Sequence, residues 1–178
     1  MIDNFIKTIE KTFPPTQLFS DHIRRSIIDS GCEKICFSRF KNNAMGLSLH
    51  DGVYINERAI QFGMDMLLFI VFHELAHQYQ YKKYGVKKMY DVYDYSLSIE
   101  EVVGTIHKIE IVADEFSHRK IRELQKKGYI DVRFVPPRIY QNIGIGHLRS
   151  TIEGFRSEMG GVDNVSEFFY NKIIDKEL

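Results

Sequence analysis

The chain has 178 residues, of which 44% are hydrophobic and 27% are charged, which is the usual size and composition of one globular domain. It carries 24 Lys and Arg against 24 Asp and Glu, and this balance argues against a protein that coats nucleic acid or a membrane surface, because both partners favour a basic excess. With 13 Phe and 10 Tyr, the chain can bury a substantial core, which excludes intrinsic disorder.

The first thirty residues predict two helices. Apolar residues recur at three- and four-residue steps over 2–13, which is typical of an amphipathic helix, and Pro14 and Pro15 end it. A second helix over about 18–28 is followed by Gly31, and a helix C-terminus often ends on a glycine in the left-handed conformation.

The pattern then changes to short extended runs. We expect three strands over 34–40, 44–50 and 53–56. Asp51-Gly52 separates the last two, and this dipeptide favours a tight hairpin because its residues tolerate positive φ. Two cysteines fall near this region, Cys32 at the helix end and Cys36 in the first strand, and we expect both to be reduced thiols in the core.

Two long helices follow the strands. Residues 58–83 are apolar nearly all round in their middle, which predicts a helix buried on most sides, ending at Gly85. A tyrosine-rich linker over 86–97 leads to a second helix over 98–127, where Ser98 followed by acidic residues is typical of a capped start.

The C-terminal part predicts one extended segment over 129–135 and two shorter helices near 147–159 and 164–175. Helices combined with a few strands give an α+β fold. No linker divides the chain convincingly, so we expect one domain over 1–178, with its core at about 35–127 and a helical part at about 128–178.

The buried helix carries His73-Glu74-Leu75-Ala76-His77, an H-E-x-x-H pattern. Histidines four positions apart project from one helical face, so both imidazoles can reach a single ion. Glu74 then points beside that ion, where its carboxylate can accept a proton from an attacking water. The alternative is that both histidines are ordinary core residues and Glu74 reaches solvent.

The second long helix offers a third ligand. Glu110 lies in an inward-facing stripe of 98–127, and a buried acid is costly unless a cation meets it. Asp114, one turn further on, can accept the free N–H of a ligand histidine. The alternative is a pair of solvated acids on a charged face, because Glu115 and Arg119 lie nearby.

These two motifs resemble the gluzincin metallopeptidases, whose pattern is H-E-x-x-H followed by E-x-x-x-D on the next helix. The Ala-Asp-x-Phe surroundings of Asp114 are similar to the soluble ImmA/IrrE-like peptidases and to integral-membrane gluzincins. We expect the soluble branch, because the longest apolar run, 66–72, is too short to span a bilayer. The metzincin branch is disfavoured, because the downstream glycine and third histidine of its pattern are missing.

The resemblance covers about 35–118 and implies a zincin-like fold, in which a small antiparallel or mixed sheet packs on the active-site helix and a ligand-bearing helix follows. It implies Zn²⁺ held by His73, His77 and Glu110, with Glu74 as the catalytic base and Asp114 behind a ligand. The hairpin that ends with residues 52–56 resembles the edge strand that lines the cleft in zincins and pairs with an extended substrate. The first 30 and last 50 residues resemble no family, and the helices there are additions to that fold.

The predicted function is therefore a zinc-dependent peptidase that acts on a protein or peptide. Its oxyanion needs a donor besides the metal, and five residues are candidates: Tyr90, Tyr93, Tyr95, Tyr140 and His147. His107 and His118 are not expected to be ligands.

Two alternatives stay open. One is a zinc-binding regulatory module, or a hydrolase of another amide, with a narrow target. The other is a non-enzymatic helical interaction domain, in which the motif is accidental or the metal is structural. We expect no nucleic-acid or membrane partner, and the acidic residues near the N-terminus together with the absence of an apolar signal core predict a cytoplasmic protein.

Overall fold

The computed structural model of the chain describes residues 1–93, 95–139, 145–159 and 165–175. Its α-helices are α1 (Ile2–Thr12), α2 (Gln17–Ser30), α3 (Met64–Tyr84), α4 (Val86–Tyr90), α5 (Ile99–Lys126), α7 (Ile145–Met159) and α8 (Val165–Ile173). Two short 3-10 helices are η1 (Glu57–Phe62) and η2 (Asp91–Tyr93).

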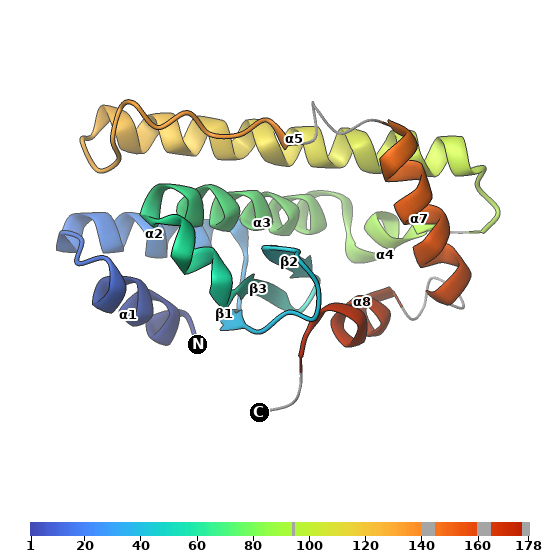
Figure 1. Ribbon diagram of the computed structural model, residues 1–178, viewed down its shortest axis with the longest axis horizontal. Helices are drawn as coiled ribbons and strands as arrows, with labels where there is room; N and C mark the ends of the chain where they lie inside the picture. Colours follow the sequence, from blue (N-terminus) through green and yellow to red (C-terminus); the bar gives the residue numbers. More distant parts are fainter. Residues whose placement is uncertain (94, 140–144, 160–164, 176–178) are drawn as a thin grey trace.

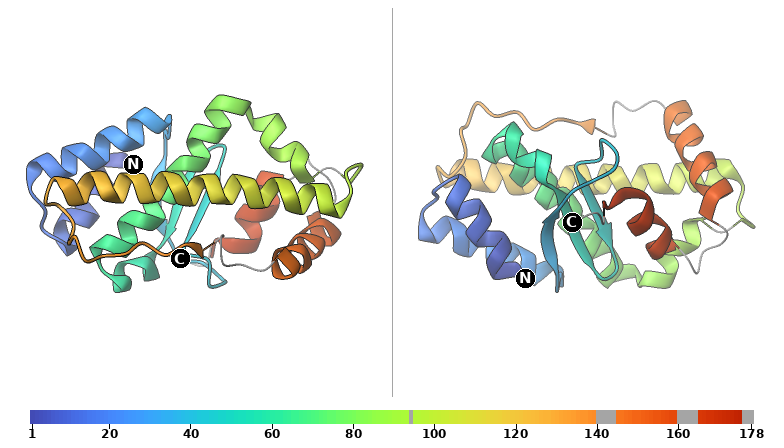
Figure 2. Two further views of the ribbon diagram at one scale, coloured as in Figure 1. Left: turned by 90° about the horizontal axis from the view of Figure 1, so that it is seen from above. Right: turned by 60° about the horizontal axis from the view of Figure 1, so that its bottom comes forward.

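Helix α3 is at the centre of the arrangement, because α5 packs on one side of it and a small sheet on the other (Figure 1). Helices α1 and α2 lie at one end of the molecule, and α7 and α8 lie at the other (Figure 2). This position agrees with the apolar middle of α3, where Leu67, Phe69 and Phe72 are all buried. Within the described residues, none of the helices combines the length and apolar character needed to cross a lipid bilayer.

The sheet has three strands in the order β1-β3-β2, where β1 is Ile35–Ser38, β2 is Gly46–Leu49 and β3 is Gly52–Asn56. Strand β1 is parallel to β3, and β2 is antiparallel to it. The structure therefore confirms an α+β fold with a small mixed sheet.

The resemblance suggested that the strand ending at Asn56 is an edge strand, and this is wrong for β3. β3 is the central strand and every residue in it is buried, so its backbone is paired on both sides. Strands β1 and β2 form the two edges of the sheet.

The predicted hairpin is present, but Gly52 is not part of its turn. Leu49 pairs with Gly52, so His50 and Asp51 form the two-residue loop and Gly52 is the first residue of β3. A glycine is needed there because a Cβ at this position would lie 2.6 Å from the carbonyl oxygen of Lys34.

Three other predicted segments differ from the structure. The helix expected over 58–83 is divided at Gly63, whose φ of 85° is strained for any residue with a side chain, so that η1 precedes α3. The linker over 86–97 contains α4 and η2.

Residues 129–135 form no strand. This segment turns back and follows α5 (Figure 1), where the Gln125 side chain donates to the carbonyl oxygens of Asp131 and Phe134. Its backbone is therefore bound by a helix side chain and not by the sheet.

The C-terminal helices share buried clusters with the rest of the chain. Phe169 and Ile173 of α8 pack with Leu49 of the sheet, in a cluster that also holds Tyr54. Leu148 and Ile152 of α7 belong to a cluster with residues of α5. Helix α7 is therefore packed against α5, which carries one of the two motifs, and α8 is packed against the sheet.

The two cysteines occupy the places that the sequence predicted. Cys32 follows Gly31 at the end of α2 and is buried as expected, whereas Cys36 in β1 is only partly buried, and both are free thiols. Burial raises the pKa of the Cys32 thiol to about 11, so it stays protonated at neutral pH and acts as a small core side chain.

We expect truncation of α3 at Leu68 to be costly, because this side chain is fully buried, whereas Leu18 of α2 is 71% exposed. Leu68→Ala should lower the free energy of unfolding by about 2–5 kcal/mol, and Leu18→Ala should change it by less than about 0.5 kcal/mol. Urea unfolding followed by circular dichroism measures both, and equal effects would contradict the central position of α3.

Candidate metal centre

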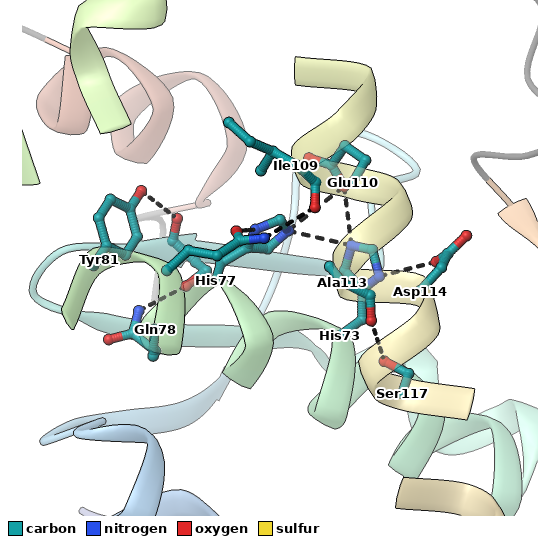
Figure 3. A network of polar contacts seen from close by, with 11 residues as sticks. His73, His77, Gln78, Tyr81, Ile109, Glu110, Ala113, Asp114 and Ser117 are labelled. Atoms are coloured by element: carbon teal, nitrogen blue, oxygen red, sulfur yellow. Dashed lines mark hydrogen bonds and ion pairs between the residues drawn. The ribbon is translucent and has the colours of Figure 1, made fainter. Parts of the chain in front are cut away.

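The two motifs meet because α3 and α5 lie side by side in opposite directions (Figure 1). His73 and His77 project from one face of α3, and Glu110 and Asp114 project from the facing side of α5 (Figure 3). The four-residue spacing in each helix places successive members of each pair one turn apart. Helix α5 begins with a capping box in which Ser98 and Glu101 satisfy each other's backbone N–H groups, which fixes its start as predicted.

Two imidazoles and one carboxylate converge at this interface. The Nε2 atoms of His73 and His77 lie 3.3 Å apart, and Glu110 Oε2 lies 3.0 Å from the first and 3.5 Å from the second. The three candidate ligand atoms are all within 4.8 Å of one another. The structure therefore brings together the three residues that the sequence singled out, in a group that could bind a metal ion.

The donor set suits a divalent cation of the zinc type. Two imidazole nitrogens and one carboxylate oxygen are the protein ligands of many catalytic zinc sites, where the fourth position is left for water. Among the residues that the structure describes, no further His, Cys, Asp or Glu joins this group. The residues present thus fit a centre with three protein ligands and one coordination position left for water.

The outer nitrogens of both imidazoles already have partners, which orients the rings. His73 Nδ1 lies 3.1 Å from Asp114 Oδ1, and the Asp114 side chain is only 1% exposed. Since a carboxylate only accepts, Nδ1 carries a hydrogen, and Nε2 is therefore the ring nitrogen that would bind a metal ion after losing its own proton. Asp114 therefore has the supporting contact that the sequence predicted.

His77 is held in a different way, by a residue that the sequence analysis did not single out. Its Nδ1 lies 2.8 Å from Gln80 Oε1, and Gln80 Nε2 donates to the carbonyl oxygen of Ile109 at 3.0 Å. That second bond fixes the amide so that its oxygen faces the imidazole. The available signal was spacing, because Gln80 lies three positions after His77 on the same helix.

The charges of the cluster depend on one another. Burial lowers the pKa of His73, but hydrogen bonds to Asp114 and Glu110 outweigh it and raise this pKa to about 10. Burial raises the pKa of Glu110, but the charge of His77 and the hydrogen bonds to both histidines hold it well below its usual range. In the metal-free chain a protonated imidazole thus supplies the positive charge that a cation would supply.

Glu74 lies beside this group and is only 8% exposed. Burial raises the pKa of its carboxyl. Gly46, the first residue of the edge strand β2, leaves the space that the side chain needs, because a Cβ there would lie 2.7 Å from Glu74 Cδ. The glycine in β2 therefore leaves room for this carboxylate.

Strand β2 is also tied to α3 by polar side chains. Gln78 donates to Ser48 Oγ at 2.6 Å and to the carbonyl oxygen of Leu49 at 2.8 Å, and Tyr81 donates to the carbonyl oxygen of Ser48 (Figure 3). These contacts fix the edge strand relative to the helix that carries both histidines.

A cavity of about 370 Å³ adjoins the cluster and is lined by both histidines, Glu74 and Glu110. Of the five candidate oxyanion donors, Tyr90 and Tyr93 line it. Tyr90 already contacts the backbone N–H and the ring of His50, and burial together with the charge of Glu110 raises the pKa of the Tyr93 phenol well above its usual value.

Tyr95 and His147 do not line this cavity. Tyr95 is exposed and packs on Arg156, His147 is exposed on α7, and Tyr140 lies outside the described residues. His107 and His118 do not belong to the group that could bind a metal.

Comparison of the chain with protein-family models, with curated proteins and with solved structures found no significant match.

We expect the purified protein to bind one divalent metal ion per chain, and Glu110→Gln to abolish this binding because the centre loses its charged ligand. Glu115→Gln is the matched control, because Glu115 is an exposed acid on the same helix. Calorimetric titration with Zn²⁺ measures both variants. Unchanged affinity in Glu110→Gln would show that Glu110 is not a ligand.

The two supporting contacts predict weaker effects of the same kind. Asp114→Ala and Gln80→Ala should each lower the affinity for Zn²⁺ about 10- to 100-fold, because each removes the acceptor that orients the ring of a ligand histidine. Gln125→Ala, which removes an amide from the far end of α5, should leave the affinity unchanged. If Gln80→Ala binds as tightly as the unmodified chain, Gln80 does not orient His77.

Proposed function

We propose that the protein is a zinc-dependent peptidase with a gluzincin-like, zincin-type centre, in which His73, His77 and Glu110 hold Zn²⁺ and Glu74 is the general base. The observation that carries the proposal is the convergence of the three ligand atoms within 4.8 Å, with the Glu74 carboxylate buried beside them at the wall of a cavity. The resemblance of the two motifs to gluzincins supports the same chemistry.

The reaction follows from the position of each side chain. A Zn²⁺ ion bound there supplies a Lewis acid that polarises the peptide carbonyl and makes water more acidic. Glu74 takes a proton from water as the oxygen attacks the carbonyl carbon, and then delivers that proton to the leaving amine nitrogen. Glu74 thus accepts one proton and then donates it, and hydrolysis of one peptide bond yields a carboxylic acid and an amine.

The path of the substrate follows from the sheet. Of the two edge strands, β1 and β2, the residues of β2 line the cavity beside Glu74. An extended peptide that pairs with this edge would place a carbonyl next to the cluster. Because β3 is paired with β1 and β2 on its two sides, we assign the substrate-binding edge to β2.

Glu74→Gln tests the chemistry directly. The variant should keep one bound Zn²⁺ and lose about 100- to 10,000-fold in the rate of peptide hydrolysis, because the amide cannot take up the proton. Zinc content and product formation from a peptide mixture, followed by mass spectrometry, measure the two properties separately. Hydrolysis at an undiminished rate would remove Glu74 from the mechanism, and bound zinc without any peptide cleavage by the unmodified protein would favour a regulatory module or another amide as substrate.

Gly46→Ala tests the position of the Glu74 carboxylate while residue 74 itself remains a glutamate. The added methyl group has to displace Glu74, and a shift of about 1 Å can cost about 100-fold in rate. Gly104→Ala is the matched control, because a Cβ at Gly104 meets nothing within 4 Å. Equal rates in the two variants would show that β2 does not set the geometry of Glu74.

A further inference from the structure

The cavity beside the cluster has an apolar wall built from the two C-terminal helices. Leu148, Ile152 and Phe155 of α7 line it, and Val165, Phe169 and Ile173 of α8 line it too. These residues recur at three- and four-residue steps, so each helix presents one continuous apolar face to the cavity. Neither helix lies in the segment that resembles a known family.

The remaining walls bring little charge. Ile106 and Ile109 of α5, next to Glu110 along the helix, and Met89 of α4 add further apolar surface. Among the described residues that line the cavity, the only groups that ionise near neutral pH are His73, Glu74, His77 and Glu110. No Lys, Arg or Asp lies within this lining.

This apolar lining discriminates between charged and apolar side chains of a bound peptide. A charged side chain placed against α7 and α8 would lose its water and find no opposite charge there, which is unfavourable. A bulky apolar side chain would exchange water for apolar contacts, which is favourable in proportion to the area covered. The volume of about 370 Å³ is at the lower end of the range for ligand pockets, which suits one large side chain with its backbone.

We propose that the wall formed by α7 and α8 is the specificity pocket of the enzyme, and that it selects peptides with a large aliphatic or aromatic side chain next to the bond that is cut. This inference rests on the proposed peptidase function, since it assigns the substrate class of the same site. It gives the C-terminal helices a role in recognition that is separate from the chemistry of the metal centre.

Thr151 provides a test that spares the core. It lines the cavity between Leu148 and Ile152 and is half-buried, and its hydroxyl only donates to the backbone of its own helix. Thr151→Lys therefore places a positive charge in the apolar wall. Ser150→Lys is the matched control, because Ser150 is the preceding residue, is exposed and does not line the cavity.

The experiment uses capped alanine pentapeptides in which the third residue is Leu, Phe, Ala, Glu or Lys. Their binding to zinc-loaded Glu74→Gln protein is measured by calorimetry, so that affinity is read without turnover, and cleavage by the unmodified protein is measured alongside. We expect the Leu and Phe peptides to bind about 10- to 100-fold more tightly than the Ala peptide, and the Glu and Lys peptides to bind most weakly.

Thr151→Lys should abolish the preference for Leu and Phe and make the Glu peptide the tightest of the set, whereas Ser150→Lys should leave the order unchanged. The proposed specificity pocket would be contradicted if all five peptides bound equally, if none bound, or if both lysine variants showed the same change. If the preference is found but the unmodified protein cuts none of the peptides, the pocket stands and the peptidase function fails.

Discussion

The rest of the site depends on one electrostatic constraint, which is that Glu110 is held between two imidazoles at the interface of α3 and α5. Its side chain is only 18% exposed, and a charged carboxylate in such a place is stable only if positive charge meets it. The two histidines meet that need when one of them is protonated, and a divalent ion would meet it with more charge. The same contact joins the two longest helices, so the chemistry and the packing of the fold share a single interface.

The motifs could be read from the sequence because helical spacing is local. His73 and His77 are four positions apart, and so are Glu110 and Asp114, so one regular helix is enough to put each pair on one face. The long apolar middle of α3, which has to be covered on all sides, also predicted that this helix would lie at the centre.

Other parts could not be predicted because they depend on contacts between distant segments. The order of the strands is one example, since only tertiary packing decides that β3 lies between β1 and β2. Gln80 is another, because its role depends on the carbonyl of Ile109 in the facing helix. The apolar wall of the cavity is a third example, since the apolar faces of α7 and α8 form one wall only after both helices have packed beside the cavity.

The central claim is that three side chains from two helices bind one zinc ion and leave it a position for water. The most direct measurement is a crystal structure of the zinc-loaded protein, with the metal located by its anomalous scattering. The account predicts one zinc bound by His73 Nε2, His77 Nε2 and Glu110, with a non-protein fourth ligand on the side of Glu74. A fourth protein ligand, or a Glu110 carboxylate turned away from the metal, would contradict it.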